Sequence, residues 1–505
     1  MQKILTPKQI KEADSHTIKK QKITSVELME RASQNCFNWI HKRLQGNPLP
    51  IKIFCGIGNN GGDGLVISRI LQSHGYNVET FVVNFSKNRS KDFLLNYEKL
   101  KTYGFWPKMI NSVNDLPKIS ENYMVIDAIF GIGLNKSPIG IAAETIKHIN
   151  QSNAYVLSID MPSGLFVDKP VTNKESVIKA DQTLTFEVPK LAFYLPDNQD
   201  YSANTEIIKI GLDTNAIAEQ NTNFYLTEKQ NIKERYKNRT RFSHKGNFGH
   251  SLIIGGSYGK IGAVTLASKS CLKIGSGLVT AYIPKCGYNI LQTAIPEVMV
   301  EVDKDKEIEF FNFKTKPTAI GIGIGLGKNT NTQKGFYKFL KNNKLPLVID
   351  ADALNILSEN KEWLNLLPKN SILTPHPKEL ERLLGKWRND YDKLEMMQNF
   401  SKKYQVILVL KGHYTAICQS KKIYFNTTGN PALATAGSGD VLTGLITGLL
   451  AQKYTPIDAC ITAVFLHGKT ADIAITESET EATFIASNII KYLSKAIKSL
   501  FNKNE

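Results

Sequence analysis

The residues best suited to chemistry lie near the C-terminal end, in the stretch Gly437-Ser438-Gly439-Asp440. A strand-like run, 422–426, precedes this stretch, and an apolar helical run, 441–451, follows it. Small residues let backbone N–H groups approach a ligand closely, and the unpaired N–H groups at a helix start favour an anion. A carboxylate at Asp440 could then remove a proton from a hydroxyl during phosphoryl transfer. An acidic residue that merely caps its own helix is the structural alternative.

A second candidate loop in the first half has the sequence Gly56-Ile57-Gly58-Asn59-Asn60-Gly61-Gly62-Asp63-Gly64. It follows a predicted strand and precedes a predicted helix, which is the βα unit in which phosphate binds. Its glycines match the nucleotide fingerprint Gly-x-Gly-x-x-Gly, which is a weak signal by itself. A plain phosphate loop has no need of a carboxylate, so the asparagines and Asp63 suggest oxygen ligands for a cation or for sugar hydroxyls.

Polar residues also end two later predicted strands of the first half. Asp127 lies in one of them, and Asp160 and Ser163 end the other. Because the carboxyl ends of parallel strands meet at one edge of a sheet, these residues should converge with Asn60 and Asp63. Their oxygen atoms could hold a monovalent or divalent cation. Each residue merely capping its own loop is the alternative.

The elements that must position these residues alternate between strand and helix. In the first half, a helical region lies within 1–40. Strands are then predicted over 51–56, 78–85, 124–133 and 154–164, and helices over 65–74 and 90–103. In the second half, strands are predicted over 251–257, 319–327, 347–355, 406–415 and 422–426, and helices over 262–274 and 441–451. The segment 372–381 is predicted to turn from strand into helix. Such alternation predicts an α/β protein with mostly parallel sheets.

A polar stretch rich in asparagine and glutamine separates the two halves. We therefore predict a first domain over 1–212, a linker over 213–235 and a second domain over 236–500. The length of 505 residues is ample for two large domains.

The composition is that of a soluble globular protein, with 42% hydrophobic and 22% charged residues. No apolar run approaches the length of roughly 18–20 residues that a membrane span needs, and the N-terminus lacks a signal-peptide core, so a cytoplasmic protein is expected. The six cysteines are scattered without a Cys-x-x-Cys pair, which favours buried thiols over zinc or disulfides.

The net charge of +17 comes mostly from lysines spread along the chain. No basic block with interleaved aromatic residues is present, so we expect a solvated lysine surface and no nucleic-acid partner. An anionic substrate would be attracted in either case.

The second half resembles the ribokinase-like family and, within it, the nucleotide-dependent NAD(P)H-hydrate dehydratases. The resemblance is carried in order by Leu373-Thr374-Pro375-His376-Pro377-x-Glu379, Lys411-Gly412-x-x-Thr415, and Gly429-Asn430-Pro431 through Gly437–Gly444. The first half resembles an NAD(P)H-hydrate epimerase domain through Gly58–Gly64, Asp127-x-x-x-Gly131-x-Gly133 and Asp160-x-Pro162-Ser163-Gly164. Together they resemble the bifunctional NAD(P)H-hydrate repair enzymes over nearly the whole chain outside the linker.

The resemblance implies two doubly wound αβα domains, the first Rossmann-like and the second ribokinase-like. It also implies a substrate, NADH or NADPH that is hydrated across a double bond of the nicotinamide ring. The first domain would interconvert the two epimers, and the second would use ADP, or alternatively ATP, to remove water from the S epimer. NAD(P)H, AMP and phosphate would result, with Mg²⁺ and K⁺ as cofactors and a homo-oligomer as the expected assembly. Hydroxide is a poor leaving group and phosphate a good one, which explains the need for a nucleotide.

In the second half, the matching positions make Asp440 the catalytic base. The nucleotide would contact residues of two loops, namely Lys411, Gly412, His413, Tyr414, Thr415, Asn430, Gly437, Ser438 and Gly439. The hydrated dinucleotide would contact Asp440 and three further residues, Ala263, Gly325 and His376. Because His376 stands between two prolines, a plain turn role is its alternative.

In the first half, Asp160 is the expected proton-handling residue, with Lys190 as its partner. The substrate would contact Asn59, Asn60, Gly61, Gly62, Asp63, Gly131, Ile132, Gly133, Leu134 and Asp160. Potassium would be held by Asn60, Asp127 and Ser163. The chain departs from the family at Ala432, where glycine is usual, and at Asn135-Lys136-Ser137, where arginine often occurs.

Two rival hypotheses remain at this point. One is a ribokinase-like kinase of a small vitamin-type alcohol, which would leave the phosphate on its product. The other is that the first half is a non-catalytic dinucleotide-binding module.

Overall fold

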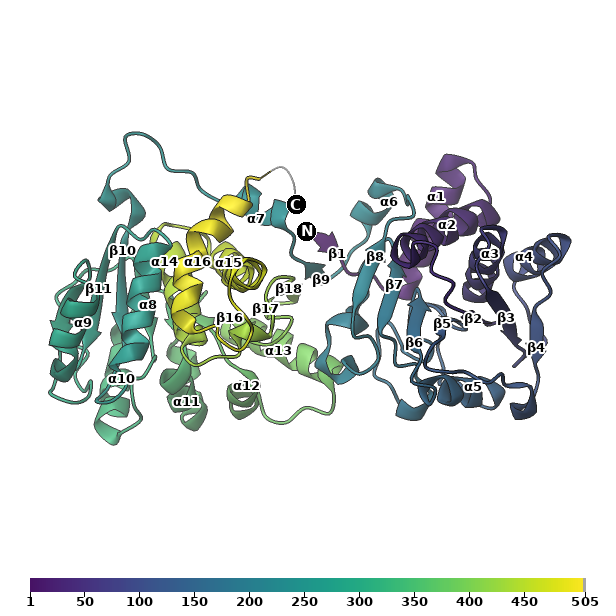
Figure 1. Cartoon of the computed structure of the whole chain (residues 1–505). Helices are drawn as coiled ribbons and strands as arrows, with labels where there is room; N and C mark the ends of the chain where they lie inside the picture. Colours follow the sequence, from purple (N-terminus) through teal and green to yellow (C-terminus); the bar gives the residue numbers. More distant parts are fainter. Residues whose placement is uncertain (503–505) are drawn as a thin grey trace. The chain divides into compact units, whose positions relative to one another are not determined.

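The computed structural model describes residues 1–502, and the chain forms two compact units (Figure 1). The N-terminal unit comprises Gln2–Thr222 together with Asn389–Tyr391, and the C-terminal unit comprises most of the remainder from Asn223 onward. The division falls inside the segment 213–235, which is folded: it contains α6 (Thr214–Glu219), β9 (Phe224–Leu226) and α7 (Lys229–Arg235).

The N-terminal unit is built on a seven-stranded sheet in the order β4-β3-β2-β5-β6-β7-β8. All neighbouring strands in it are parallel, as predicted. The strands are β2 (Ile51–Cys55), β3 (Val78–Val83), β4 (Lys108–Ile110), β5 (Met124–Ala128), β6 (Tyr155–Ile159), β7 (Gln182–Phe186) and β8 (Thr205–Ile208). One face is covered by α2 (Ser25–Leu44), α3 (Asn59–Ser73) and α4 (Lys91–Thr102), and the other by α5 (Ile141–Asn150) (Figure 1).

The helical region predicted within 1–40 consists of two separate helices. The first, α1 (Pro7–Gln21), begins after Thr6, whose side chain accepts a hydrogen bond from Gln9 N, and α2 begins in the same way after Thr24. Lys22 adopts a left-handed conformation between them. These caps satisfy N–H groups that would otherwise lack partners, so each helix has its own start.

The C-terminal unit has its own sheet, in the order β9-β18-β17-β16-β15-β14-β13-β10-β11-β12. Its strands from β12 to β16 run parallel, and β17 runs antiparallel to both neighbours. The strands beyond β9 are β10 (His250–Ile254), β11 (Leu278–Ile283), β12 (Met299–Val302), β13 (Ala319–Ile322), β14 (Leu347–Ile349), β15 (Ile372–Leu373), β16 (Ile407–Leu410), β17 (Ala416–Gln419) and β18 (Lys422–Phe425).

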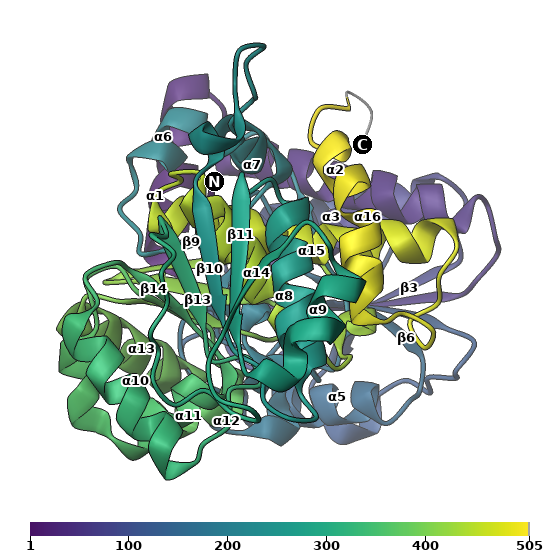
Figure 2. The ribbon, with the colours of Figure 1, turned by 90° about the vertical axis from the view of Figure 1, so that its left-hand side faces the viewer.

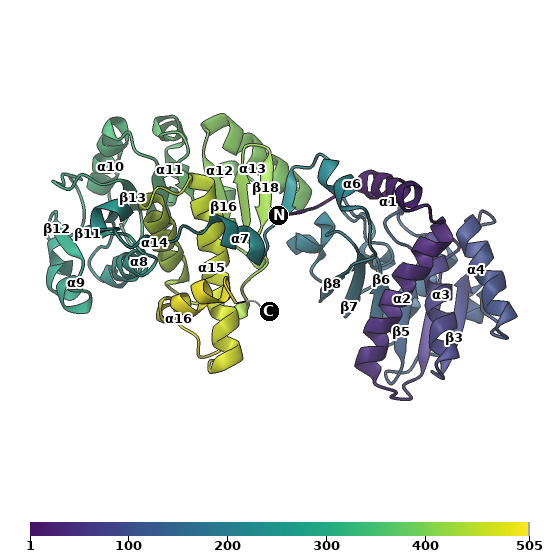
Figure 3. The ribbon, with the colours of Figure 1, turned by 90° about the horizontal axis from the view of Figure 1, so that it is seen from above.

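Helices cover both faces of this sheet, which gives a second three-layer unit (Figures 2 and 3). One layer contains α8 (Ile261–Lys273), α9 (Tyr288–Ala294), α14 (Ser438–Ala451), α15 (Pro456–Glu477) and α16 (Ala486–Ser499). The opposite layer contains α10 (Thr330–Asn342), α11 (Ala351–Glu359), α12 (Pro377–Leu384) and α13 (Asp390–Tyr404). Both units are thus αβα sandwiches, as the fold prediction required. Within 1–502, no helix is long and apolar enough to cross a membrane.

Helix α14 lies unusually close to α8. A Cβ atom on Gly444 would lie 2.0 Å from Ser270 Oγ and 2.1 Å from Ala267 O, and one on Gly448 would lie 2.4 Å from Ile274 Cγ2. Ser270 Oγ also donates to Val441 O at 3.0 Å. Glycine is therefore required where the two helices cross, and the contact fixes the position of α14 along its axis.

Several predicted boundaries are wrong. The strands expected over 319–327 and 406–415 end at Ile322 and Leu410. The strand expected over 347–355 ends at Ile349, and α11 begins at Ala351. The glycine-rich segment 59–64 belongs to the first turns of α3 and is not a loop.

Candidate active sites

The predicted anion hole of the C-terminal unit lies at the start of α14. Gly437 has φ of 86°, a left-handed conformation that favours glycine, and a Cβ atom there would lie 2.6 Å from Leu266 Cδ1. The helix then begins at Ser438, so Gly439 and Asp440 occupy its first turn. The unpaired N–H groups of this turn form a site that favours a phosphate group.

A partly buried ion pair places a lysine ammonium group beside this turn. Lys411 Nζ lies 2.9 Å from Asp350 Oδ1 and 4.0 Å from Glu379 Oε2. Asp350 is only 2% exposed, and its other oxygen accepts a hydrogen bond from Thr443 Oγ1 at 2.8 Å. Burial alone would lower the pKa of Lys411, but the charges of Asp350 and Glu379 outweigh it and raise that pKa. A Cβ atom on Gly439 would lie 3.4 Å from Lys411 Nζ, so the ammonium group adjoins the anion hole.

The environment of Asp440 suits a general base. Burial, and then the negative charge of Asp350, raise its pKa from 3.8 to about 6, although the charge of Lys411 acts in the opposite sense. A base with a pKa just below the working pH is both ionised and a good proton acceptor.

A cavity of about 660 Å³ adjoins the start of α14. Residues predicted to contact the nucleotide line it, namely Lys411, Gly412, His413, Thr415, Asn430, Ser438 and Gly439. Tyr414 and Gly437 are not among the lining residues. Further lining comes from residues that the sequence did not single out, including Asn426, Thr428, Leu433, Leu442, Val464 and His467.

His467, on α15, is a contact of this loop that the sequence analysis missed. Its Nε2 lies 3.0 Å from the carbonyl oxygen of Ser438, to which it donates, and 3.2 Å from Ser438 Oγ. Burial lowers the pKa of His467 to about 4, so the ring is neutral near pH 7. A single histidine in an apolar helical run gives no signal that separates it from an ordinary core residue.

The four residues predicted for the dinucleotide, Asp440 among them, lie outside the lining of this cavity. Gly325 is left-handed, and a Cβ atom there would lie 3.4 Å from Ala263 Cβ, so these two residues are neighbours. His376 caps α12: its Nδ1 accepts from Lys378 N at 3.1 Å, while its Nε2 lies 3.5 Å from Glu379 Oε1. The turn role considered for His376 is therefore present, and only Nε2 is left for a ligand.

The N-terminal unit has a cavity of about 760 Å³ beside the carboxyl ends of its strands. Most residues predicted to contact the substrate line it, namely Asn59, Asn60, Asp63, Gly131, Ile132, Gly133, Leu134 and Asp160. Gly61 and Gly62 do not. A Cβ atom on Gly61 would lie 1.9 Å from Gly56 O, and one on Gly62 would lie 2.8 Å from Met29 Sδ, so these glycines allow α3 to pack closely.

Asp160 is held in a defined orientation at this cavity. Its backbone is left-handed, with φ of 65°, which is uncommon for a residue with a side chain. Lys190 Nζ lies 3.1 Å from Asp160 Oδ1, and Ile132 N donates to Asp160 Oδ2 at 3.0 Å. Lys190 is completely buried and also donates to Phe186 O at 2.7 Å. Burial lowers the pKa of Lys190, and the charge of Asp160 opposes that shift.

The three residues predicted to hold potassium occupy the same end of the sheet. Asp127 accepts hydrogen bonds from Ser163 Oγ at 2.5 Å, Ser163 N at 2.8 Å and Ser158 Oγ at 2.8 Å. Both polar atoms of the Asn60 side chain are buried without a hydrogen-bond partner. A Cβ atom on Gly131 would lie 3.2 Å from Asn60 Cγ and 2.8 Å from Asp160 Oδ2, which places both side chains around this loop.

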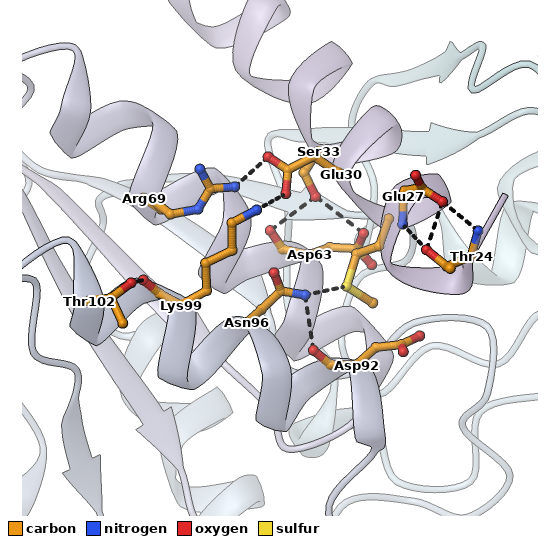
Figure 4. A network of polar contacts seen from close by, with 11 residues as sticks. Thr24, Glu27, Glu30, Ser33, Asp63, Arg69, Asp92, Asn96, Lys99 and Thr102 are labelled. Atoms are coloured by element: carbon orange, nitrogen blue, oxygen red, sulfur yellow. Dashed lines mark hydrogen bonds and ion pairs between the residues drawn. The ribbon is translucent and has the colours of Figure 1, made fainter.

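Asp63 lies on α3 among polar residues of α2 and α4 (Figure 4). Ser33 Oγ lies 3.3 Å from both Asp63 O and Asp63 Oδ1. Burial, followed by the charge of Asp160, raises the pKa of Asp63 well above its usual value. Outside it, Arg69 and Lys99 pair with Glu30, so Asp63 has no cation of its own in this network.

The close packing at the start of α3 leads to a first prediction. We expect Gly61→Ala to lower the free energy of unfolding of the N-terminal unit by about 3 kcal/mol, because the new methyl group would overlap the Gly56 carbonyl. Gly58→Ala is the matched control, since a Cβ atom there has no neighbour within 4 Å and its φ is −97°. Urea unfolding that found the two variants equally stable would contradict the packing role of Gly61.

Two family models match separate segments of the chain. Residues 25–192 match the family model described as YjeF-related protein N-terminus, and residues 251–495 match that of NAD(P)H-hydrate dehydratase. A solved structure, the ADP/ATP-dependent NAD(P)H-hydrate dehydratase from Bacillus subtilis, is 26% identical, covers 55% of this chain and 100% of its own, and has a TM-score of 0.48.

Two curated relatives are similar along almost the whole chain, and both are named bifunctional NAD(P)H-hydrate repair enzyme. The protein from Moorella thermoacetica is 32% identical over 95% of this chain and 93% of its own length. The protein from Coxiella burnetii is 32% identical over 93% of this chain and 94% of its own. This chain therefore belongs to the family of bifunctional NAD(P)H-hydrate repair enzymes.

Proposed function

We propose that this chain repairs hydrated NADH and NADPH with two activities. The N-terminal unit interconverts the R and S hydrates, and the C-terminal unit removes water from the S hydrate at the expense of ADP. The observation that carries the proposal is the pairing of Asp440, a carboxyl with a pKa of about 6, with an anion hole and the Lys411 ammonium. This arrangement suits phosphoryl transfer to a hydroxyl group.

In the C-terminal unit, the oxygen of the substrate hydroxyl attacks the β-phosphorus of ADP, and Asp440 accepts the proton of that hydroxyl. AMP leaves, and the N–H groups at the start of α14 hold the phosphoryl group in transit, with Lys411 balancing its charge. The substrate then carries a phosphate ester in place of a hydroxyl. Loss of inorganic phosphate, together with a proton from the neighbouring carbon, restores the ring double bond.

The nucleotide contacts we propose are the predicted ones: Lys411, Gly412, His413, Tyr414, Thr415, Asn430, Gly437, Ser438 and Gly439. Ala263, Gly325 and His376 bind the hydrated dinucleotide. Mg²⁺ is bound in such sites by one or two carboxylates and phosphate oxygens, and would supply further positive charge there. Glu379, whose Oε2 lies 4.0 Å from Lys411 Nζ, would be such a carboxylate, and Asp440 would stay free to accept the proton.

In the N-terminal unit, Asp160 handles a proton and Lys190 fixes its orientation. The substrate contacts are those predicted, Asn59, Asn60, Gly61, Gly62, Asp63, Gly131, Ile132, Gly133, Leu134 and Asp160. For potassium, Asn60, Asp127 and Ser163 offer the hard oxygen atoms that such an ion prefers. The unpartnered Asn60 oxygen fits that role, and Ser163 Oγ has a second acceptor in Phe130 O at 3.4 Å, which would free one lone pair of Asp127.

The test is to mix each purified hydrate of NADH with the protein, with and without ADP, and to follow the absorbance of the reduced nicotinamide. Recovery should require ADP, with AMP and phosphate as products, and the R hydrate should be consumed after epimerisation. If neither hydrate reacts while a small hydroxymethyl compound is phosphorylated and keeps its phosphate, the rival kinase is the correct reading. A homo-oligomer and a cytoplasmic location stay predictions.

The raised pKa of Asp440 predicts how dehydration depends on pH. The base is ionised above about pH 6 and protonated below it. We therefore expect kcat/KM to be constant above about pH 7 and to fall about tenfold for each pH unit below 6. The neutral His467, with its pKa near 4, does not titrate in this range. A profile that stays flat down to pH 5 would exclude Asp440 as the base.

A further inference from the structure

Some residues that line the cavity of the N-terminal unit precede the segment that matches the family model. Helix α1 ends at Gln21, and the match begins at residue 25. Four residues of α1, namely Lys11, Asp14, Ser15 and Ile18, line the cavity. Their spacing places them on one side of the helix, while Ile10, Ala13 and Thr17 are buried on another.

Asp14 is the one carboxyl that α1 presents to this cavity. Within residues 1–502, the Asp14 carboxyl group has no hydrogen bond or ion pair. Asp160 lines the same cavity, but its two carboxylate oxygens contact Lys190 Nζ and Ile132 N. Burial, followed by the charge of Asp160, raises the pKa of Asp14 from 3.8 to about 6. Lys190 and Lys11 oppose this shift, and Glu187 adds to it.

We propose that Asp14 is a second catalytic residue of the N-terminal site and exchanges protons with the substrate together with Asp160. The inference rests on the proposed epimerisation. Asp14 and Asp160 line one cavity but have different surroundings, since the Lys190 ammonium and the Ile132 amide contact the Asp160 carboxylate directly and do not contact that of Asp14. Paired carboxyls in unlike environments are the usual arrangement for an acid and a base that act on one substrate.

The chemistry of epimerisation needs two such groups. The hydroxyl is on the carbon next to the ring nitrogen, and inversion requires the C–O bond to break and to form again on the other face. The acid protonates the departing oxygen, the nitrogen lone pair forms a C=N bond, and one water leaves. One water then adds to the opposite face, its proton goes to the base, and the electron pair returns to nitrogen. The reverse reaction exchanges the two roles, so no oxidant or further reactant is needed.

The test uses the full-length protein without ADP, so that dehydration does not occur. Purified R hydrate of NADH is the substrate, and chromatography separates the epimers. We expect Asp14→Asn to lower kcat for epimerisation about 100-fold with KM changed less than about threefold. Glu12→Gln, an exposed carboxyl on the same helix, is the matched control and should keep the wild-type rate. A rate for Asp14→Asn within threefold of wild type, or a loss seen only in KM, overturns the proposal.

The pH profile gives a second readout. Because the active form carries one proton on the pair, wild-type kcat/KM should fall above about pH 6 as Asp14 loses its proton, equally in both directions. Asp14→Asn should lack this limb, and Asp14→Glu should retain it with a rate at least about fivefold above that of Asp14→Asn. Equal rates for these two variants, or an unchanged limb in Asp14→Asn, overturn the proposal.

Measuring both activities distinguishes a wrong role for Asp14 from a wrong function for the N-terminal unit. ADP-dependent dehydration of the S hydrate should stay within about twofold of wild type in the three variants, since that site belongs to the other unit. If the wild-type protein epimerises neither hydrate, the proposed function of the N-terminal unit is wrong. If it does so and Asp14→Asn does so equally well, only the role of Asp14 is wrong.

Discussion

Replacing Asp440 by asparagine should lower kcat for ADP-dependent dehydration about 1,000-fold. The amide keeps the size of the side chain at the first turn of α14 but cannot accept the proton of the hydroxyl. Lys411 stays in place through Asp350, so we expect the affinity for ADP to change little. Isothermal titration with ADP and a coupled assay of AMP release measure the two effects separately.

Epimerisation by the same variant is the internal control and should be unchanged. Dehydration by Asp440→Asn at more than a tenth of the wild-type rate would contradict the mechanism.

The Asp440→Asn variant should also be more stable than wild type at pH 7. Because folding raises the pKa of Asp440 from 3.8 to about 6, the ionised carboxylate destabilises the folded state above pH 6. This penalty, and with it the advantage of the amide, disappears as the pH falls from 6 to 3.8.

Lys190→Met should destabilise the N-terminal unit by about 3–5 kcal/mol, because it leaves the Asp160 carboxylate buried without its cation. Methionine fills a similar volume, so the loss comes from charge and hydrogen bonding and not from a cavity. Phe186 O also loses its donor. Hydrogen exchange of the amides in β5 and β6 reports the stability of this unit separately from the other, which a chain of two units requires.

Lys209→Met is the matched control for this prediction. Its side chain is 64% exposed, and its Nζ lies 3.5 Å from Glu187 Oε1, so its removal should cost no more than about 0.5 kcal/mol. Equal protection of β5 and β6 amides in the two variants would show that the Lys190 pair does not stabilise the unit.

The parts of both sites that follow strand ends and glycine runs were predictable from the sequence. Asp127 and Ser163 meet because β5 and β6 are parallel neighbours, which the alternation of elements already implied. Asp440 stands at the start of α14 because small residues precede an apolar helical run. In each case, a local pattern and a general rule of parallel sheets determine the position.

Residues on helices were not predictable in the same way. On α1, Lys11, Glu12 and Asp14 are equally polar in sequence, and only the packing of the helix decides which of them lines the cavity. His467 was missed for the same reason. The glycines of 59–64 were assigned to a loop because glycine is a poor helix former, yet they belong to α3, where Cβ atoms would overlap Gly56, Met29 and Ala128.

Because α14 packs closely on α8, substitutions in this contact should affect the dehydratase although they lie away from Asp440. Gly444 and Gly448 lie one and two turns beyond Asp440, and neither lines the cavity at the start of α14. A methyl group at either position would shift the whole helix and with it the amides at its start, which we propose bind phosphate. A substitution at either glycine would therefore alter turnover although the residue contacts no ligand. Directed evolution toward a different phosphate donor should leave both glycines unchanged.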